Sequence, residues 1–113
     1  MKKLEVIVRP ENLEDIKTIL DKNNCGGMTL LTAMGCGKQK GEKGALLKGV
    51  KVNINLLPKI QVNVVIEDEI LEDVLREIKE TISTGKVGDG KVFVYDVYDA
   101  MRIRTWERGT KAI

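Results

Sequence analysis

The stretch TGKVGDGK at residues 84–91 separates an apolar segment with helical spacing from a segment rich in β-branched and aromatic residues. Its three glycines allow turns with positive φ and let main-chain N–H groups approach a ligand closely. Successive N–H groups in such a turn can bind an anion, and two lysines add positive charge. The glycine spacing fits neither the Walker A motif nor the dinucleotide fingerprint. The stretch therefore predicts a helix-to-strand junction, and two interpretations are open: a phosphate cradle or a plain tight turn.

The rest of the chain alternates between strand and helix patterns around this junction. Period-2 or continuous apolar segments predict four strands, at residues 4–8, 28–34, 57–66 and 92–97. Helical spacing with acidic residues in the first turn predicts two helices, at residues 13–22 and 67–82. This order predicts a ferredoxin-like α+β fold, βαββαβ, with a four-stranded antiparallel sheet and both helices on one face. The other face keeps apolar positions that a partner chain would cover.

Residues 38–51 follow neither pattern, because they are rich in lysine and glycine and have no sustained apolar period. We expect a long exposed loop here, between the second and third strands. Loops of this length are uncommon in compact domains and are usually functional.

Composition limits the classes of function. A net charge of +2 and only four aromatic residues argue against direct nucleic-acid binding. The absence of histidine excludes histidine zinc sites and Ser/His or Cys/His catalysis. Cys25 and Cys36 form no C-x-x-C motif, which predicts two reduced thiols. With no apolar signal region and no apolar run near 18 residues, we expect one cytoplasmic domain over residues 1–113.

The chain resembles the PII nitrogen-signalling family, the GlnB/GlnK-like proteins. The motifs that carry the resemblance occur in family order: LEVIVRP at 4–10, GMT at 27–29, GCGKQKG at 35–41, LPK at 57–59, TGKVGDGK at 84–91 and RIRT at 102–105. They cover nearly the whole chain, and two of them are long and specific.

The resemblance implies a homotrimer with a nucleotide site in each cleft between neighbours. Family members bind ATP or ADP there and, with ATP and Mg²⁺, also 2-oxoglutarate. A T-loop, here about residues 37–55, docks on target proteins. A B-loop at about 84–91 wraps the phosphates, and a C-terminal loop at about 102–113 reaches in from the neighbour.

The resemblance also implies roles for individual residues. The nucleotide-binding residues are Ile7, Thr29, Gly35, Gly37, Lys38, Gln39, Val65, Gly88, Asp89, Gly90, Lys91, Arg102 and Arg104. Those for 2-oxoglutarate are Gln39, Lys40, Gly41 and Lys59, with Gln39 completing the coordination of Mg²⁺. Those for the target are Lys43, Leu47, Lys48 and Lys51. From the sequence alone, without the resemblance, the default interpretation of Arg102, Arg104 and Lys59 is that they are solvated charges at strand ends.

Three positions depart from the family pattern. Val52 occupies the position of the tyrosine that family members modify, and residues 37–55 contain neither tyrosine nor serine, so we expect no uridylylation. Asn63 replaces a frequent glutamate near the nucleotide, and Trp106 replaces the glycine of an Arg-Thr-Gly-Glu motif.

We therefore expect a non-enzymatic sensor of ATP/ADP and 2-oxoglutarate. Its target would be an ammonium channel, which is its only expected link to a membrane, or an enzyme of nitrogen assimilation. Two alternatives are an adenylate-only sensor that has lost 2-oxoglutarate binding and a slow ATPase timer. The chain offers no histidine base and no separate acid/base pair for rapid hydrolysis.

Overall fold

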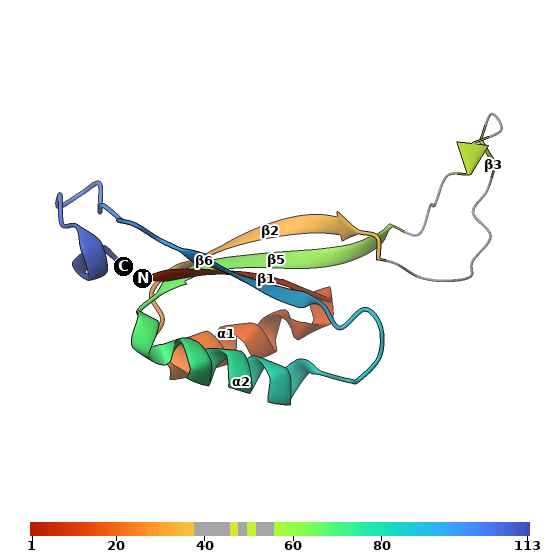
Figure 1. Ribbon diagram of the computed structural model, residues 1–113, viewed down its shortest axis with the longest axis horizontal. Helices are drawn as coiled ribbons and strands as arrows, with labels where there is room; N and C mark the ends of the chain where they lie inside the picture. Colours follow the sequence, from red (N-terminus) through yellow and green to blue (C-terminus); the bar gives the residue numbers. More distant parts are fainter. Residues whose placement is uncertain (38–45, 48–49, 52–55) are drawn as a thin grey trace.

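A four-stranded antiparallel sheet carries two helices on one face (Figure 1). The computed structural model describes residues 1–37, 46–47, 50–51 and 56–113. The main elements, in chain order, are β1 (Lys2–Val8), α1 (Leu13–Lys22), β2 (Met28–Gly35), β5 (Leu57–Ile66), α2 (Leu71–Ile82) and β6 (Lys91–Asp96). The strand order is β2-β5-β1-β6, with every neighbouring pair antiparallel. The predicted ferredoxin-like fold is confirmed.

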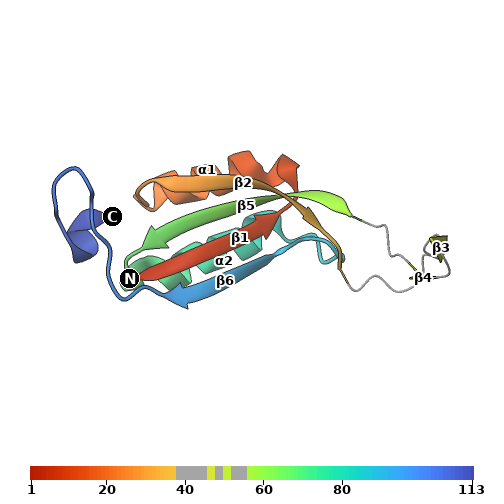
Figure 2. The same ribbon diagram turned by 90° about the horizontal axis from the view of Figure 1, so that it is seen from above.

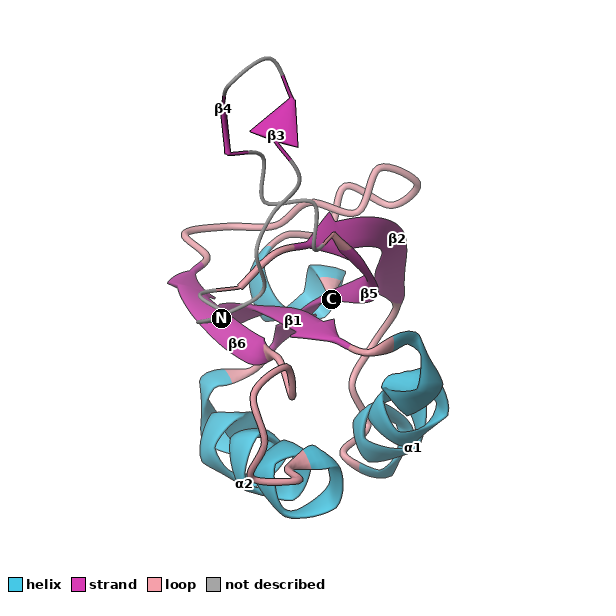
Figure 3. Ribbon diagram, turned by 90° about the vertical axis from the view of Figure 1, so that its right-hand side faces the viewer, coloured by secondary structure: helices cyan, strands magenta, loops and turns pink. Residues whose placement is uncertain are grey.

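The core lies between the sheet and the helices, which sit side by side below the sheet in Figure 3. Alternate side chains of the two central strands enter it, because successive residues of a strand point to opposite faces. The buried residues are Leu4, Val6 and Val8 of β1, Val62, Val64 and Ile66 of β5, Ile16, Ile19 and Leu20 of α1, and Val74, Ile78 and Ile82 of α2. Each of these segments follows its predicted apolar period.

The helix starts differ from the prediction in one respect. Each α-helix is preceded by a short 3₁₀ turn, over Pro10–Asn12 before α1 and over Asp68–Ile70 before α2. The acidic residues from Glu67 therefore form a turn, and α2 itself begins at Leu71. Proline in the first of these turns fits a position whose N–H has no helical partner.

The expected long loop contains a pairing that the sequence did not predict. Strands β3 (Leu46–Leu47) and β4 (Val50–Lys51) form a separate two-stranded antiparallel sheet (Figure 2). Two residues are too few to show a strand period. The remainder of the expected loop, residues 38–45, 48–49 and 52–55, lies outside the described residues.

The face of the sheet opposite the helices has a polar centre and apolar margins. At the centre, Gln61 Nε2 donates to Glu5 Oε1 at 2.6 Å and the Tyr95 hydroxyl donates to Glu5 Oε2 at 2.8 Å. Leu31 on β2 and Phe93 on β6 are exposed on the two edge strands. Exposed apolar residues around a satisfied polar centre suit a surface that another chain covers.

Two further expectations concern cysteines and membranes. Cys25 and Cys36 are not joined in a disulfide, as predicted, and burial raises the pKa of the Cys25 thiol. Within the described part of the chain, no helix has both the length and the apolar content needed to cross a bilayer.

The core packing is testable on helix α2. We expect Ile78→Ala to lower the free energy of unfolding by about 2–5 kcal/mol, because it removes buried methyl groups and leaves a cavity. Glu80→Ala, on the exposed side of the same helix, should change it by less than about 0.5 kcal/mol. Urea unfolding at a fixed protein concentration measures both. Equal losses in the two variants would contradict this assignment of the core.

Candidate functional site

Residues 84–91 form a tight loop that connects α2 to β6. Gly85, Gly88 and Gly90 have φ of +78°, +100° and +110°, in the region that L side chains rarely adopt. Gly90 also approaches the end of β1 closely, because a Cβ at this position would lie 2.0 Å from the carbonyl oxygen of Ile7. The glycines are therefore required by the backbone path, as the motif predicted, and Gly90 is required by packing as well.

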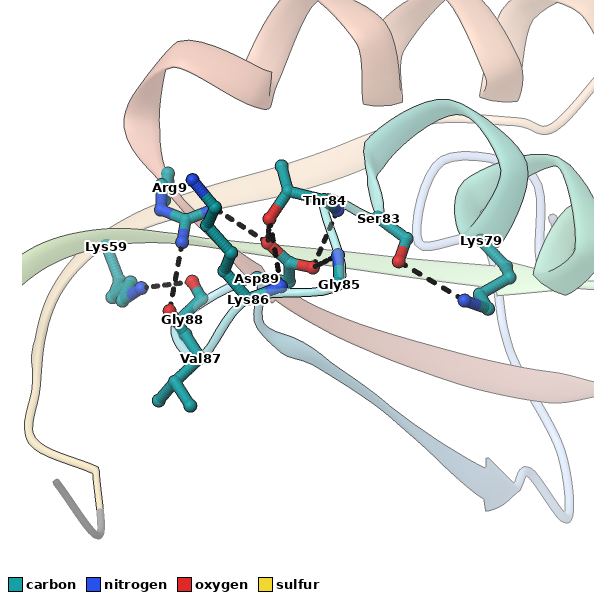
Figure 4. A network of polar contacts seen from close by, with 10 residues as sticks. All are labelled: Arg9, Lys59, Lys79, Ser83, Thr84, Gly85, Lys86, Val87, Gly88 and Asp89. Carbon is teal, nitrogen blue, oxygen red and sulfur yellow. Dashed lines mark hydrogen bonds and ion pairs between the residues drawn. The ribbon is translucent and has the colours of Figure 1, made fainter. Parts of the chain in front are cut away.

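The carboxylate of Asp89 holds the start of this loop (Figure 4). It accepts hydrogen bonds from the main-chain N–H groups of Thr84 at 2.7 Å and Gly85 at 3.1 Å, and from the Thr84 hydroxyl at 2.5 Å. Arg9 Nη1 donates to the same carboxylate at 2.9 Å. These bonds, above all those from Thr84 and Arg9, hold the pKa of Asp89 well below its usual range. Asp89 is therefore ionised at neutral pH and turned inward.

Two cationic side chains from the sheet contact the main chain of the loop (Figure 4). Arg9, directly after β1, donates from Nη2 to the Val87 carbonyl oxygen at 3.2 Å. Lys59, near the start of β5, donates from Nζ to the Gly88 carbonyl oxygen at 2.8 Å. Both cations face carbonyl groups of the loop. Arg9 is paired with Asp89, whereas Lys59 contacts a neutral carbonyl group and raises the positive potential beside the loop, which favours a bound anion.

A cavity of about 620 Å³ lies at the other end of the sheet. Its lining includes Thr29 of β2, Val65 of β5 and Arg102 of the C-terminal segment, three of the residues that the resemblance implies for the nucleotide. Gly26, Gly27 and Ile113 complete one side. The lining combines apolar residues with the Thr29 hydroxyl and the Arg102 guanidinium, so it suits a ligand that has both apolar surface and an anionic group.

Arg102 begins a short turn in the C-terminal segment. The Trp106 N–H donates to the Arg102 carbonyl oxygen at 2.8 Å, and Arg102 Nη1 donates to Glu107 Oε1 at 3.1 Å. Trp106 closes the turn with φ of +68°, and 72% of its surface is exposed. The backbone of Trp106 is therefore in the left-handed conformation that glycine adopts more easily. Arg104, within the turn, is exposed.

The site residues form two groups, which lie at opposite ends of the sheet within one protomer. Gly35 pairs with Leu57 near the glycine-rich loop, whereas Thr29 pairs with Asn63 near the cavity. Six positions separate Thr29 from Gly35 on β2, which at about 3.3 Å per residue is roughly 20 Å. The structure thus groups Ile7, Gly35 and Lys59 with the loop, and Thr29, Val65 and Arg102 with the cavity.

Comparison with known proteins identifies the family. The family model described as Nitrogen regulatory protein P-II matches residues 1–107. The chain belongs to the P-II family. It is 42% identical over 113 residues to Nitrogen regulatory protein P-II of Rhodospirillum rubrum and to that of Haemophilus influenzae, with full coverage of each chain. It is 43% identical to Nitrogen regulatory protein P-II 1 of Methanothermobacter thermautotrophicus, which it covers to 97%. The resemblance inferred from the motifs is confirmed.

Several residues that the resemblance singles out in this P-II protein cannot be placed. Lys38, Gln39, Lys40, Gly41, Lys43 and Lys48 lie outside the described residues. Leu47 and Lys51 lie on β3 and β4.

Sequence reasoning missed Arg9 as a site residue of this P-II protein. It stands 80 positions before Asp89, so no local spacing connects the two. The available signal was an arginine between the last apolar residue of β1 and Pro10, where the chain leaves the sheet.

The close approach of Gly90 to β1 gives a matched pair of variants. Gly90→Ala should lower the free energy of unfolding by about 2–5 kcal/mol, because strain and a clash with the Ile7 carbonyl add together. Gly85→Ala meets no atom within 4 Å, so we expect only the strain of about 1–2 kcal/mol. Urea unfolding measures both. An equal loss in the two variants would show that the contact with β1 contributes nothing.

Proposed function

We propose that this P-II protein is a non-enzymatic sensor that binds ATP or ADP and, with Mg-ATP, 2-oxoglutarate. The observation that carries the proposal is the loop at residues 84–91, with its three positive-φ glycines beside the cations of Arg9 and Lys59. Such a loop suits a polyphosphate, because charge-assisted hydrogen bonds from N–H groups and cations stabilise several anionic oxygens.

We propose further that each nucleotide site is shared between two protomers of a homotrimer. Two observations support this arrangement. The loop and the cavity beside Arg102 lie at opposite ends of the sheet in one protomer, so a neighbouring copy can supply the second half of a site. The open face of the sheet carries exposed Leu31 and Phe93, which contact between copies would cover. Within this arrangement, Arg102 and Arg104 bind the phosphates of the nucleotide held by the neighbour's loop.

Lys59 connects the nucleotide to 2-oxoglutarate in this proposal. Its ammonium group lies beside the phosphate loop, 2.8 Å from the Gly88 carbonyl oxygen. From there it can pair with a carboxylate of 2-oxoglutarate, while the amide oxygen of Gln39 completes the coordination of Mg²⁺ on the nucleotide. Lys40 and Gly41 hold the other end of the effector. Gln39, Lys40 and Gly41 enter through the family resemblance alone.

The output of the sensor is contact with a target through residues 37–55, including Lys43, Leu47, Lys48 and Lys51. We propose an ammonium channel or an enzyme of nitrogen assimilation as the target, met in the cytoplasm. These residues contain neither tyrosine nor serine, so bound effectors rather than uridylylation control the contact.

Two alternatives give distinct outcomes. An adenylate-only sensor is favoured by Asn63, which lines the cavity beside Thr29, and by Trp106, which closes the turn that begins at Arg102. Slow ATP hydrolysis as a timer is the second alternative, and it predicts release of inorganic phosphate.

Calorimetry distinguishes the sensor from the adenylate-only alternative. We expect 2-oxoglutarate to bind in the presence of Mg-ATP and not with Mg-ADP or without nucleotide. Lys59→Gln should abolish this binding, because it removes the cation that pairs with the carboxylate, and should weaken ATP binding less. Glu80→Ala is the control. Wild-type protein that binds ATP and never 2-oxoglutarate would favour the adenylate-only sensor, and binding of neither would overturn the proposal.

Mixed trimers test the shared site. Lys91→Gln removes a loop cation, and the double variant Arg102→Gln/Arg104→Gln removes the cations of the tail. Each homotrimer should lose high-affinity ATP binding. A trimer that contains both kinds of chain has one cleft with both halves intact, so mixing after unfolding and refolding should restore about one site per mixed trimer. A site built within one chain would be restored in none.

A further inference from the structure

Arg9 follows β1 near the N-terminus and contacts the loop at residues 84–91 at two points. Its guanidinium group donates from Nη1 to Asp89 at 2.9 Å and from Nη2 to the Val87 carbonyl oxygen at 3.2 Å. Figure 4 shows it between Lys59 and Thr84, facing the loop. One planar group thus holds a side chain and a main-chain atom two positions apart.

We propose that Arg9 is the positioning residue of the phosphate loop: it fixes the loop path that binds polyphosphate without itself touching the nucleotide. The inference rests on the proposed nucleotide-binding function. It concerns which part of the ligand depends on Arg9, namely the phosphates and not the base.

The bonds of Asp89 extend the effect of Arg9 over the whole loop. Asp89 accepts from the N–H groups of Thr84 and Gly85 at the beginning of the loop. Arg9 binds that same carboxylate and the carbonyl of Val87 further along. The guanidinium therefore joins the carboxylate that holds the first turn of the loop to the carbonyl of Val87 near its tip, and its loss would remove this link while Asp89 keeps its bonds to Thr84 and Gly85.

The packing around Gly88 points to the same role. A Cβ at position 88 would lie 3.0 Å from Nη2 of Arg9, so the guanidinium packs directly against the main chain there. The side chains of Arg9 and Asp89 are only 27% and 20% exposed. A partly desolvated pair loses more when one partner is removed than a fully exposed pair does, because the remaining charge keeps its desolvation cost.

The positive charge of Arg9 contributes less to the affinity for a polyphosphate than its position does. Asp89 neutralises it at short range, so the pair contributes little net attraction for a distant anion. The effect of Arg9 on affinity must therefore come mainly through geometry. Lysine carries the same charge without the planar fork and can make one of the two contacts, so Arg9→Lys should be intermediate.

The experiment compares ATP with AMP, which has the same base and sugar and only one phosphate. Calorimetry on the full-length protein would use wild type, Arg9→Gln, Arg9→Lys, Asp89→Asn and Arg9→Gln/Asp89→Asn. The control is Arg76→Gln, which removes another arginine paired with an aspartate, Asp73, on the surface of α2. Thermal unfolding reports whether each variant is folded.

We expect Arg9→Gln to weaken ATP binding about 10-fold or more and AMP binding about 3-fold or less, because the loss falls on bonds to the phosphates. Arg9→Lys should fall between wild type and Arg9→Gln, and Arg76→Gln should match wild type. The double variant should lose less affinity for ATP than the two single variants together predict, since both single variants remove the shared contact between Arg9 and Asp89. If Arg9→Gln does not fold, the ratio of ATP to AMP affinity in Arg9→Lys and Asp89→Asn decides the question.

Two results would overturn the inference alone: wild-type ATP affinity in Arg9→Gln, or equal losses for ATP and AMP, which indicate a general structural role. A wild-type protein that binds neither nucleotide would overturn the proposed function, and the role of Arg9 with it. The two failures are therefore distinguishable from one set of titrations.

Discussion

Strand β1 is hydrogen-bonded along both edges, to β5 and to β6, and this double pairing fixes the strand on which the glycine-rich loop rests. Its buried residues Leu4, Val6 and Val8 pack against both helices through one face. Its last residues provide the surface on which the glycine-rich loop rests, through the Ile7 carbonyl and the side chain of Arg9. A loop that would be mobile by composition is thus fastened to the least accessible strand of the sheet.

Much of the fold follows from elementary patterns in the sequence. Alternation at Leu4, Val6 and Val8 and the helical spacing of Val74, Ile78 and Ile82 each correspond to burial on one face. Patterns of this kind predict which residues face the core, but a pairing of two residues, such as β3 with β4, is shorter than any period. The 3₁₀ turn before α2 was also missed, because acidic residues suit either kind of helical first turn.

The candidate site was predictable only where the chemistry is local. The three glycines of the loop stand out because positive φ selects glycine whatever the rest of the chain does. The two side chains that donate to Asp89 were not equally predictable from the sequence. Thr84 is a near neighbour of Asp89, whereas Arg9 is 80 positions away. The pairing of Thr29 with Asn63 and of Gly35 with Leu57 is a matter of register between β2 and β5, which neither segment of the sequence shows by itself. The family resemblance supplied the list of residues, and the fold divided that list between two ends of the molecule.

The turn that begins at Arg102 has an optical consequence. Trp106 is the only tryptophan in the chain, and its indole is largely exposed to solvent on that turn. Tryptophan fluorescence of this protein therefore originates at a single known point, held by the Arg102 carbonyl. Any molecule that covers the turn from Arg102 to Trp106, whether a small ligand or a second protein chain, changes the polarity around this one fluorophore. The native chain therefore carries an intrinsic fluorescent probe beside Arg102.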